Sequence, residues 1–349
     1  MANLRPMLFM GLLVLSYFMW IEWQKDYGPK PQVQQATQTT QTTGSTSDAS
    51  SIPVPRDSSV PQTNGVPSAG DLPSVGSGTP DMDPQFGSQA EMTGESGLLK
   101  VTTDVVEVGI DLVGGTIVSA KLLNYAVELE IPDIKVDLLN KSGPEMFVAQ
   151  SGLLSRAAAP NHTAQYQSDN MDYRLSEGMD EIRVPLTWED ASGIRVTKTF
   201  IFKRGNYDIA VRHTLSNQSG TTWSGSRYDQ LQRSIIADRD DGGFTNPGRY
   251  SFFGIGFYSP TEKFEKVDFE DVASEPYKRS FADGWLSMVQ HYFFAAWIPP
   301  ETQINSYSTE IYAPNGFPRY IARAVSPAVE VSNGASHEFE SRLYVGPKL

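Results

Sequence analysis

Residues 194–217 read IRVTKTFIFKRGNYDIAVRHTLSN, and this stretch decides the fold. Before Arg204-Gly205-Asn206, apolar residues occur at Ile194, Val196, Phe200 and Phe202; after it, Tyr207, Ile209, Val211, His213 and Leu215 alternate with polar or small residues. A period of two places alternate side chains on opposite faces of a strand, and a short glycine-containing loop joins two such strands. The stretch therefore predicts a β-hairpin with one face toward a core and one toward water.

Similar short apolar segments continue through the rest of the chain from residue 98 onward. They span residues 99–110, 116–122, 182–188, 288–298, 306–312 and 338–345, with Gly114-Gly115, Asp283-Gly284 and Asn333-Gly334 as turn signals. No long segment of helical period occurs among them. A domain of about 250 residues with this many strands and aromatic side chains favours stacked sheets over a small barrel. We predict a mainly β fold, a large β-sandwich over residues 98–346.

The N-terminus carries the stretch that is most able to enter a bilayer. Residues 6–23 (PMLFMGLLVLSYFMWIEW) have the length of a membrane-spanning helix. We predict a transmembrane signal anchor whose key residues are Arg5, Met7, Phe9, Leu12, Leu15, Phe18, Trp20 and Trp23. A cleaved signal peptide is the alternative, but the bulky and charged residues 22–26 form no small-residue cleavage site. The charge around the apolar core predicts that residues 1–5 are cytoplasmic and the rest is exported.

A change in composition follows the apolar segment. Residues 24–97 are dominated by Gln, Thr, Ser, Gly, Pro and Asp, as in QQATQTTQTTGSTSDASS at residues 34–51. Such a segment cannot bury enough apolar surface to offset its conformational entropy. We predict a disordered linker that holds the exported β domain near the membrane.

The charge and cysteine content limit the possible partners and chemistry. The chain has 28 Lys and Arg against 41 Asp and Glu, a net charge of −13, which argues against nucleic acid as a partner. The absence of Cys excludes disulfides, thiolate catalysis and thiolate metal sites. A domain of this kind depends on an ordinary hydrophobic core, and its expected partners are proteins or neutral ligands.

Residues able to perform chemistry are few. His213 lies on the apolar face of the predicted hairpin, which favours a packed, hydrogen-bonded core histidine over a ligand contact. His162 and His337 lie in polar surroundings, and we expect them to be solvated. The cluster Asp238, Asp240 and Asp241 matches a calcium loop poorly and favours a solvated turn. The sequence therefore predicts no enzymatic activity, no cofactor and no metal site.

Five segments together resemble the bacterial YidC membrane-insertase family. They are residues 5–27 (RPMLFMGLLVLSYFMWIEWQKDY), 197–217 (TKTFIFKRGNYDIAVRHTLSN), 252–272 (FFGIGFYSPTEKFEKVDFEDV), 283–299 (DGWLSMVQHYFFAAWIP) and 342–349 (RLYVGPKL). The resemblance implies a protein of the bacterial inner membrane with a cytoplasmic N-terminus. It also implies a periplasmic β-supersandwich, similar to galactose mutarotase, after the first helix.

The resemblance also implies a function. In the family, five further membrane helices form a hydrophilic groove with one Arg, and residues 347–349 would begin the connection to them. Such a protein inserts, folds and assembles integral membrane proteins, alone or with the Sec translocon including SecD and SecF. This chain would supply the anchor and the partner-binding domain. One alternative is a periplasmic sugar- or peptide-binding module, which would need His213 or His291 in a cleft beside a carboxylate. The other is a purely structural spacer, for which deletion of residues 98–345 would leave insertion intact.

One aromatic segment near the C-terminus is a candidate contact surface for a partner or ligand. Its members are Trp285, Met288, His291, Tyr292, Phe293 and Trp297. Burial in the sandwich core is the stronger competing interpretation. If it holds, replacing Tyr292 or Trp297 by Ala lowers thermal stability.

Overall fold

The computed structural model describes residues 17, 98–235, 252–313 and 317–348. The chain divides into two units, Met1–Thr63 and Asn64–Leu349, and the fold described below belongs to the second. The expected anchor (6–23) and linker (24–97) lie outside the described residues, apart from Tyr17, which is helical. Within the described part of the chain, no helix is long and apolar enough to cross a membrane.

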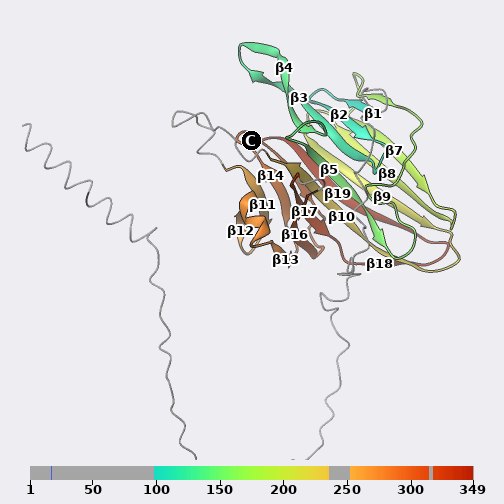
Figure 1. The fold of residues 1–349 in the computed structure, drawn as a ribbon. Coiled ribbons are helices and arrows are strands. Elements are labelled where there is room, and N and C mark those ends of the chain that lie inside the picture. Colours follow the sequence, from blue (N-terminus) through green and yellow to red (C-terminus); the bar gives the residue numbers. More distant parts are fainter. Residues whose placement is uncertain (1–16, 18–97, 236–251, 314–316, 349) are drawn as a thin grey trace, which may run out of the picture. The chain divides into compact units, whose positions relative to one another are not determined.

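The described residues of the second unit form two β-sheets (Figure 1). The first, of eleven strands, contains β1 (Leu98–Thr102), β2 (Val106–Asp111), β3 (Thr116–Glu128), β4 (Ile131–Asn140), β5 (Phe147–Ser155), β6 (Asp172–Arg174), β10 (Trp223–Ser234), β13 (Lys278–Phe281), β16 (Asn305–Tyr312), β17 (Arg319–Val325) and β18 (Val329–Val331). The second, of eight, contains β7 (Glu181–Glu189), β8 (Ile194–Lys203), β9 (Asp208–Asn217), β11 (Gly254–Ser259), β12 (Lys263–Val267), β14 (Trp285–Val289), β15 (Phe293–Ile298) and β19 (Ser336–Pro347). One short 3₁₀ helix, η2 (Phe269–Ala273), follows β12. The predicted mainly β fold is confirmed.

β13 and β12 are edge strands of the first and the second sheet, and each is paired on one side only. The first sheet runs β13-β16-β17-β10-β5-β4-β3-β2-β1-β6, and the second runs β12-β11-β14-β15-β19-β9-β8-β7. Pairing is antiparallel except between β1 and β6. The edge strands β12 and β13 are joined only by residues 268–277, so the two edges lie in neighbouring parts of the chain.

The predicted hairpin is formed by β8 and β9. Its apolar positions face the core, where Val196, Phe200 and Val211 are buried. Gly205 in the connecting turn has a φ of 68°, a conformation that favours glycine. Its backbone N–H donates to the carboxylate of Asp104, which ties the turn to the first sheet.

Two expected segments are each divided by a turn. Residues 99–110 form β1 and β2, separated at Thr103, whose hydroxyl oxygen accepts from the backbone N–H groups of Val105 and Val106. Residues 288–298 contain the end of β14, a loop and β15. Apolar residues lie close to both turns on either side, so hydrophobicity alone does not show the break.

The core lies between the two sheets and is drawn from both of them. Leu99 and Val108 come from the first sheet, and Val211 and Leu343 from the second. β10 crosses the centre of the first sheet, where it pairs with β5 and β17, and nearly all of its side chains are buried. It therefore carries polar groups through the middle of the domain.

Candidate functional site

The six residues of the expected contact surface separate into core and surface positions. Met288 and Trp297 are fully buried, and the Trp297 indole N–H donates to the Gln230 carbonyl oxygen over 3.0 Å. Trp285, His291 and Phe293 are half-buried, whereas Tyr292 is 64% exposed. The burial interpretation therefore holds for Trp297 and is wrong for Tyr292, because Tyr292 lies in the loop between β14 and β15.

Trp285 belongs to an aromatic cluster on β11, β12 and β14. Its ring stacks on Tyr258 with a centroid distance of 5.5 Å and an interplanar angle of 7°, and Phe264 lies 5.7 Å away. Gly256 allows this arrangement, since a Cβ there would lie 2.5 Å from the Phe264 ring. Packing between neighbouring strands explains the position of Trp285.

The loop between β14 and β15 lies beside the last described residues. The backbone N–H of Lys348 donates to the Tyr292 carbonyl oxygen at 2.8 Å, and its ammonium donates to the His291 carbonyl oxygen at 3.0 Å. Phe293 packs edge-on against Tyr125 of β3 at 5.4 Å. These contacts bring the C-terminal end of the domain, the exposed Tyr292 and the β3–β4 hairpin together.

His213 is a core residue, as expected, but the hydrogen bond expected for its ring is not formed with any described residue. It is fully buried, and neither ring nitrogen has a hydrogen-bond partner among the described residues. Burial, and then the charges of Lys198 and Arg227, lower its pKa well below 6.5. His213 therefore lies in no open cleft and is not the cleft histidine that the sugar-binding alternative requires.

A buried charge network surrounds His213. Arg227 and Asp229 form an ion pair, with 2.9 Å between Nε and Oδ2, and Ser341 donates to the other Asp229 oxygen at 2.9 Å. Burial raises the pKa of Asp229, and its charged and hydrogen-bonding neighbours, Arg227 first, oppose that shift.

Lys198 donates hydrogen bonds of 2.9 Å each to the carbonyl oxygens of Gly114, Gly115 and Ser151. Burial lowers the pKa of Lys198 to about 7, and the Asp229 charge opposes that shift. The network joins the two sheets and is structural.

The sequence interpretation missed a polar row on the other face of β10. Gln230 donates to Gln150 at 2.6 Å, and Arg323 donates to Gln230 at 2.8 Å. His162, expected to be solvated, instead lies half-buried with Nδ1 2.7 Å from the Tyr228 hydroxyl. Burial, then Arg323 and Lys198, lower the pKa of His162 to about 4. These residues lie far apart in the sequence and come together only through the pairing of β5, β10 and β17. No sequence motif therefore predicts them.

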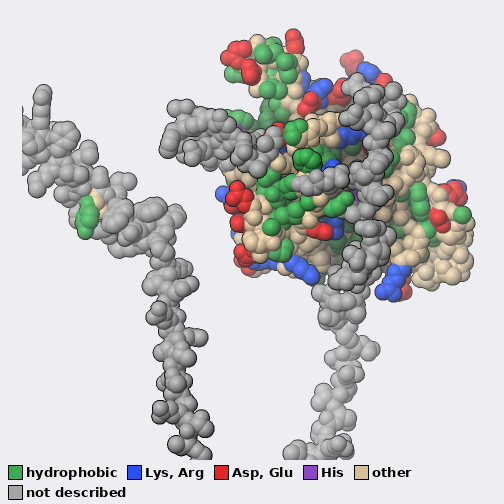
Figure 2. Space-filling model, in the orientation of Figure 1, with side chains coloured by type: hydrophobic (Ala, Val, Ile, Leu, Met, Phe, Trp, Pro, Cys, Tyr) green, Lys and Arg blue, Asp and Glu red, His purple; other side chains and the backbone are tan. Residues whose placement is uncertain are grey.

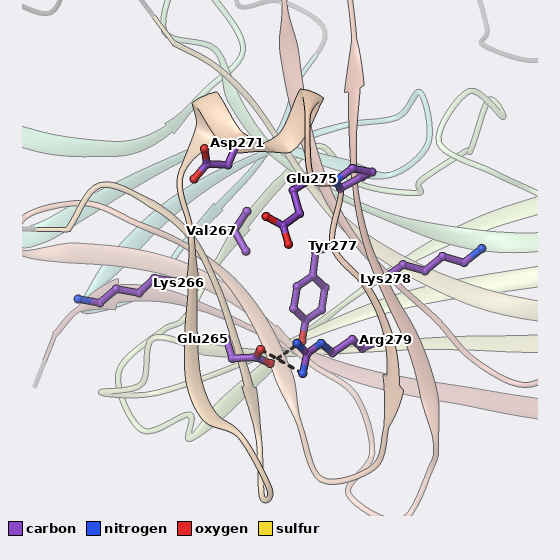
Figure 3. Close-up of a pocket in the computed structure, with 9 residues that line it drawn as sticks. Glu265, Lys266, Val267, Asp271, Glu275, Tyr277, Lys278 and Arg279 are labelled. Carbon is purple, nitrogen blue, oxygen red and sulfur yellow. Dashed lines mark hydrogen bonds and ion pairs between the residues drawn. The ribbon is translucent and has the colours of Figure 1, made fainter. Parts of the chain in front are cut away.

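A surface recess lies where the edge strands β12 and β13 approach each other (Figure 3). It has a volume of about 340 Å³ and is lined by Glu265, Lys266, Val267, Asp271, Glu275, Pro276, Tyr277, Lys278 and Arg279. Glu265 connects the two edges: it accepts from the Tyr277 hydroxyl at 2.8 Å and pairs with Arg279 at 3.3 Å. Tyr277 is held from behind by Phe257, whose ring stacks on it at 4.0 Å. The floor of the recess is therefore rigid.

Two carboxylates of the recess are available to a ligand. Asp271 on η2 and Glu275 after it make no ion pair with any other described residue, and Figure 3 shows both side chains at the upper side of the recess. Edge strands also present unpaired backbone N–H and C=O groups. An extended segment with a basic side chain matches these features.

For the residues that the structure describes, no group of three His, Asp or Glu could hold a metal ion. The aspartates 238, 240 and 241 lie outside them.

Comparison with known proteins identifies the family. The family model of the YidC periplasmic domain matches residues 98–349. A membrane protein insertase YidC of Methylococcus capsulatus is 38% identical over 351 residues, covering 100% of this chain and 58% of that protein. The chain belongs to the YidC family. A YidC insertase of Nitrosococcus oceani is 34% identical and is covered to 59% of its length. The chain thus spans less than two thirds of these YidC proteins, which are named as insertases and not as enzymes.

Solved structures of similar fold include galactose mutarotase relatives. A galactose mutarotase related enzyme of Lactobacillus acidophilus has 10% sequence identity and a TM-score of 0.44, with 72% of this chain and 100% of that chain covered. A galactose mutarotase-like protein of Lactobacillus casei has 11% identity and the same TM-score and coverage. At this level the similarity says nothing about ligands or chemistry in the YidC domain.

Proposed function

We propose that the protein inserts, folds and assembles integral membrane proteins in the bacterial inner membrane, alone or with the Sec translocon. In this proposal residues 6–23 anchor the chain with its N-terminus in the cytoplasm, and residues 98–346 are a periplasmic partner-binding domain. The observation that carries it is the match to YidC insertases over the whole chain, which includes the apolar N-terminus as well as the β domain.

The properties of the bilayer explain why transfer across the membrane and binding of partners are assigned to different parts of the protein. A polar, water-filled recess within the membrane lowers the cost of moving a hydrophilic segment across it. A periplasmic β-sandwich cannot supply such a recess. Its contribution is to bind and position proteins at the outer surface of the membrane, while the groove of the longer relatives does the transfer.

An insertion assay in the native bacterium tests the proposed function. The chromosomal gene is placed under a repressible promoter, and insertion of a small inner-membrane protein with a short translocated tail is followed by protease protection. We expect depletion to stop insertion and the intact gene to restore it. Normal insertion in depleted cells, with the protein absent by immunoblot, would contradict the proposal. A gene without codons 98–346 then measures what the periplasmic domain adds.

We further propose that the recess between β12 and β13 contacts a periplasmic segment of SecD or SecF. Support comes from the two carboxylates without ion pairs and from the open strand edges. The test is copurification of SecD and SecF with the double variant Asp271→Asn, Glu275→Gln. The control is Glu177→Gln, which alters an exposed carboxylate outside the recess. We expect loss of both subunits only in the double variant. Equal recovery in both variants would contradict this site.

A further inference from the structure

The β3–β4 hairpin carries a concentration of exposed aliphatic side chains at its tip. Val127 is 59% exposed, Leu129 93%, Ile131 43% and Ile134 54%. Single exposed apolar residues are common on protein surfaces, but four large ones within eight residues form a patch that usually has a partner. In Figure 2 these green side chains project from the domain together with red acidic ones.

The base of the hairpin is firmly held, so the tip is displayed on a rigid support. Leu122 and Leu139 are fully buried in the core, and Tyr125 packs against Phe293 and Tyr207 at 5.4 and 6.3 Å. Beyond Tyr125 the strands leave the core, and their side chains are partly or fully exposed. At about 3.3 Å per residue, Leu129 extends roughly 13 Å beyond the base.

The tip projects at the same end of the domain as the last described residue. Phe293, against which the base packs, is next to Tyr292, and Lys348 binds the Tyr292 carbonyl oxygen at 2.8 Å. Figure 1 shows the hairpin rising beyond the sheets near the C-terminal end. In the proposed function the segments that follow this end enter the membrane, which places the tip close to the bilayer.

We propose that the tip of the β3–β4 hairpin rests on the outer surface of the inner membrane. Leu129, Val127 and Ile131 enter the boundary between headgroups and acyl chains, and this inference rests on the proposed function. The carboxylates of Glu128, Glu130 and Asp133 make no ion pair with any described residue and stay in water. They limit the depth of insertion and disfavour anionic lipid, so the contact is shallow and apolar.

The absence of Cys makes a site-specific test possible. Leu129→Cys is labelled with an environment-sensitive nitrobenzoxadiazole dye, and the 349-residue chain is reconstituted into phosphatidylcholine vesicles containing lipids spin-labelled near the headgroup. Ile304→Cys is the matched control, because Ile304 is an aliphatic residue that is 60% exposed and follows the opposite end of β15. Protein that floats with the vesicles is measured.

We expect the dye at position 129 to lose about half of its fluorescence to the spin-labelled lipid, and the dye at 304 to lose no more than about a tenth. Adding Val127→Asp and Ile131→Asp should reduce the loss at position 129 to the control level, which excludes insertion driven by the dye alone. Replacing half of the lipid with phosphatidylglycerol should weaken the quenching.

Full quenching of the position-129 dye by aqueous iodide, with no quenching by the lipid, would overturn the membrane contact. Protection from iodide that appears only when native membrane proteins are added would assign the tip to a protein partner instead, and would also overturn it. Either result leaves the insertion assay unchanged, so a failure of this inference is distinguishable from a failure of the proposed function.

Discussion

Lys198 on β8 lies directly opposite His213 on β9, and both side chains are fully buried. Two basic groups thus share the core of a domain that is acidic overall. Asp229 is the carboxylate of this cluster, and its closest charged partner is Arg227, at 2.9 Å. Burial lowers the pKa values of both Lys198 and His213, so the stability of the domain should depend on pH through each of these two groups.

Acid should destabilise the domain through His213. Its folded pKa lies well below 6.5, so as pH falls below about 6.5 the unfolded chain takes up a proton that the folded chain does not. The resulting loss approaches 1.4 kcal/mol per pH unit in this window. In His213→Leu we expect a smaller loss between pH 7 and pH 5, measured by urea unfolding. The half-buried His337, replaced by Gln, is the control. An identical loss in His213→Leu and the wild type would contradict this assignment.

Removing the Lys198 ammonium should destabilise the domain. In Lys198→Met three buried carbonyl oxygens lose their donor, which costs about 3–5 kcal/mol at pH 7. Burial lowers the folded pKa to about 7, so the unfolded chain binds more protons between pH 7 and 10.5, and the wild type gains stability as pH rises. The variant should lack this gain in denaturant titrations at pH 7 and 9. Lys203→Met, an exposed change on the same strand, should behave as the wild type does.

A methyl group at Gly115 should disturb the Lys198 site. Gly115 has a φ of 54°, and a Cβ there would lie 3.0 Å from Lys198 Cδ. Gly143, with a φ of 84° and no atom within 4 Å of its Cβ position, is the matched control. Both Ala variants bear the left-handed backbone cost of about 1–2 kcal/mol, and Gly115→Ala adds about 1–3 kcal/mol of overpacking. Equal midpoints in thermal unfolding would show that the site has room.

Two aromatic residues of one predicted surface should respond differently to truncation. Trp297→Ala removes a buried side chain and a hydrogen bond between the sheets, so we expect a loss of about 3–5 kcal/mol. Tyr292→Ala alters a side chain that is 64% exposed and should change stability by less than about 0.5 kcal/mol. Calorimetry of the two variants measures the difference. A large loss in Tyr292→Ala would place that ring in a contact within the folded domain.

The sequence shows strands where one face is apolar and the other polar. β8 and β9 are of this kind, and their alternation, turn and core histidine could be predicted. β10 reads WSGSRYDQLQRS and is buried on both faces, so polar side chains point into the protein on each side and leave no alternation to detect. Hydrophobic periodicity therefore does not predict β10, although this strand lies at the centre of the first sheet.

The candidate sites depend on contacts between distant segments. The aromatic segment at residues 285–297 was visible, but alternation does not show which of its rings face a neighbouring strand and which face water. The recess requires that Glu265 on β12 meet Arg279 on β13, two edges of different sheets. The base of the β3–β4 hairpin is held by the contact between Tyr125 and Phe293, which lie far apart in the sequence. Its projecting tip could therefore not be predicted from periodicity.

The mass of the intact protein in native membranes tests the central claim most directly, that these residues are the anchor and periplasmic domain of a longer insertase. The protein is extracted from inner membranes, captured with an antibody against residues 98–346 and analysed by mass spectrometry. We expect a mass well above the 38.5 kDa of these 349 residues, because the chain covers 58% of its Methylococcus capsulatus relative. A mass of 38.5 kDa would contradict the claim and leave a protein without the membrane groove.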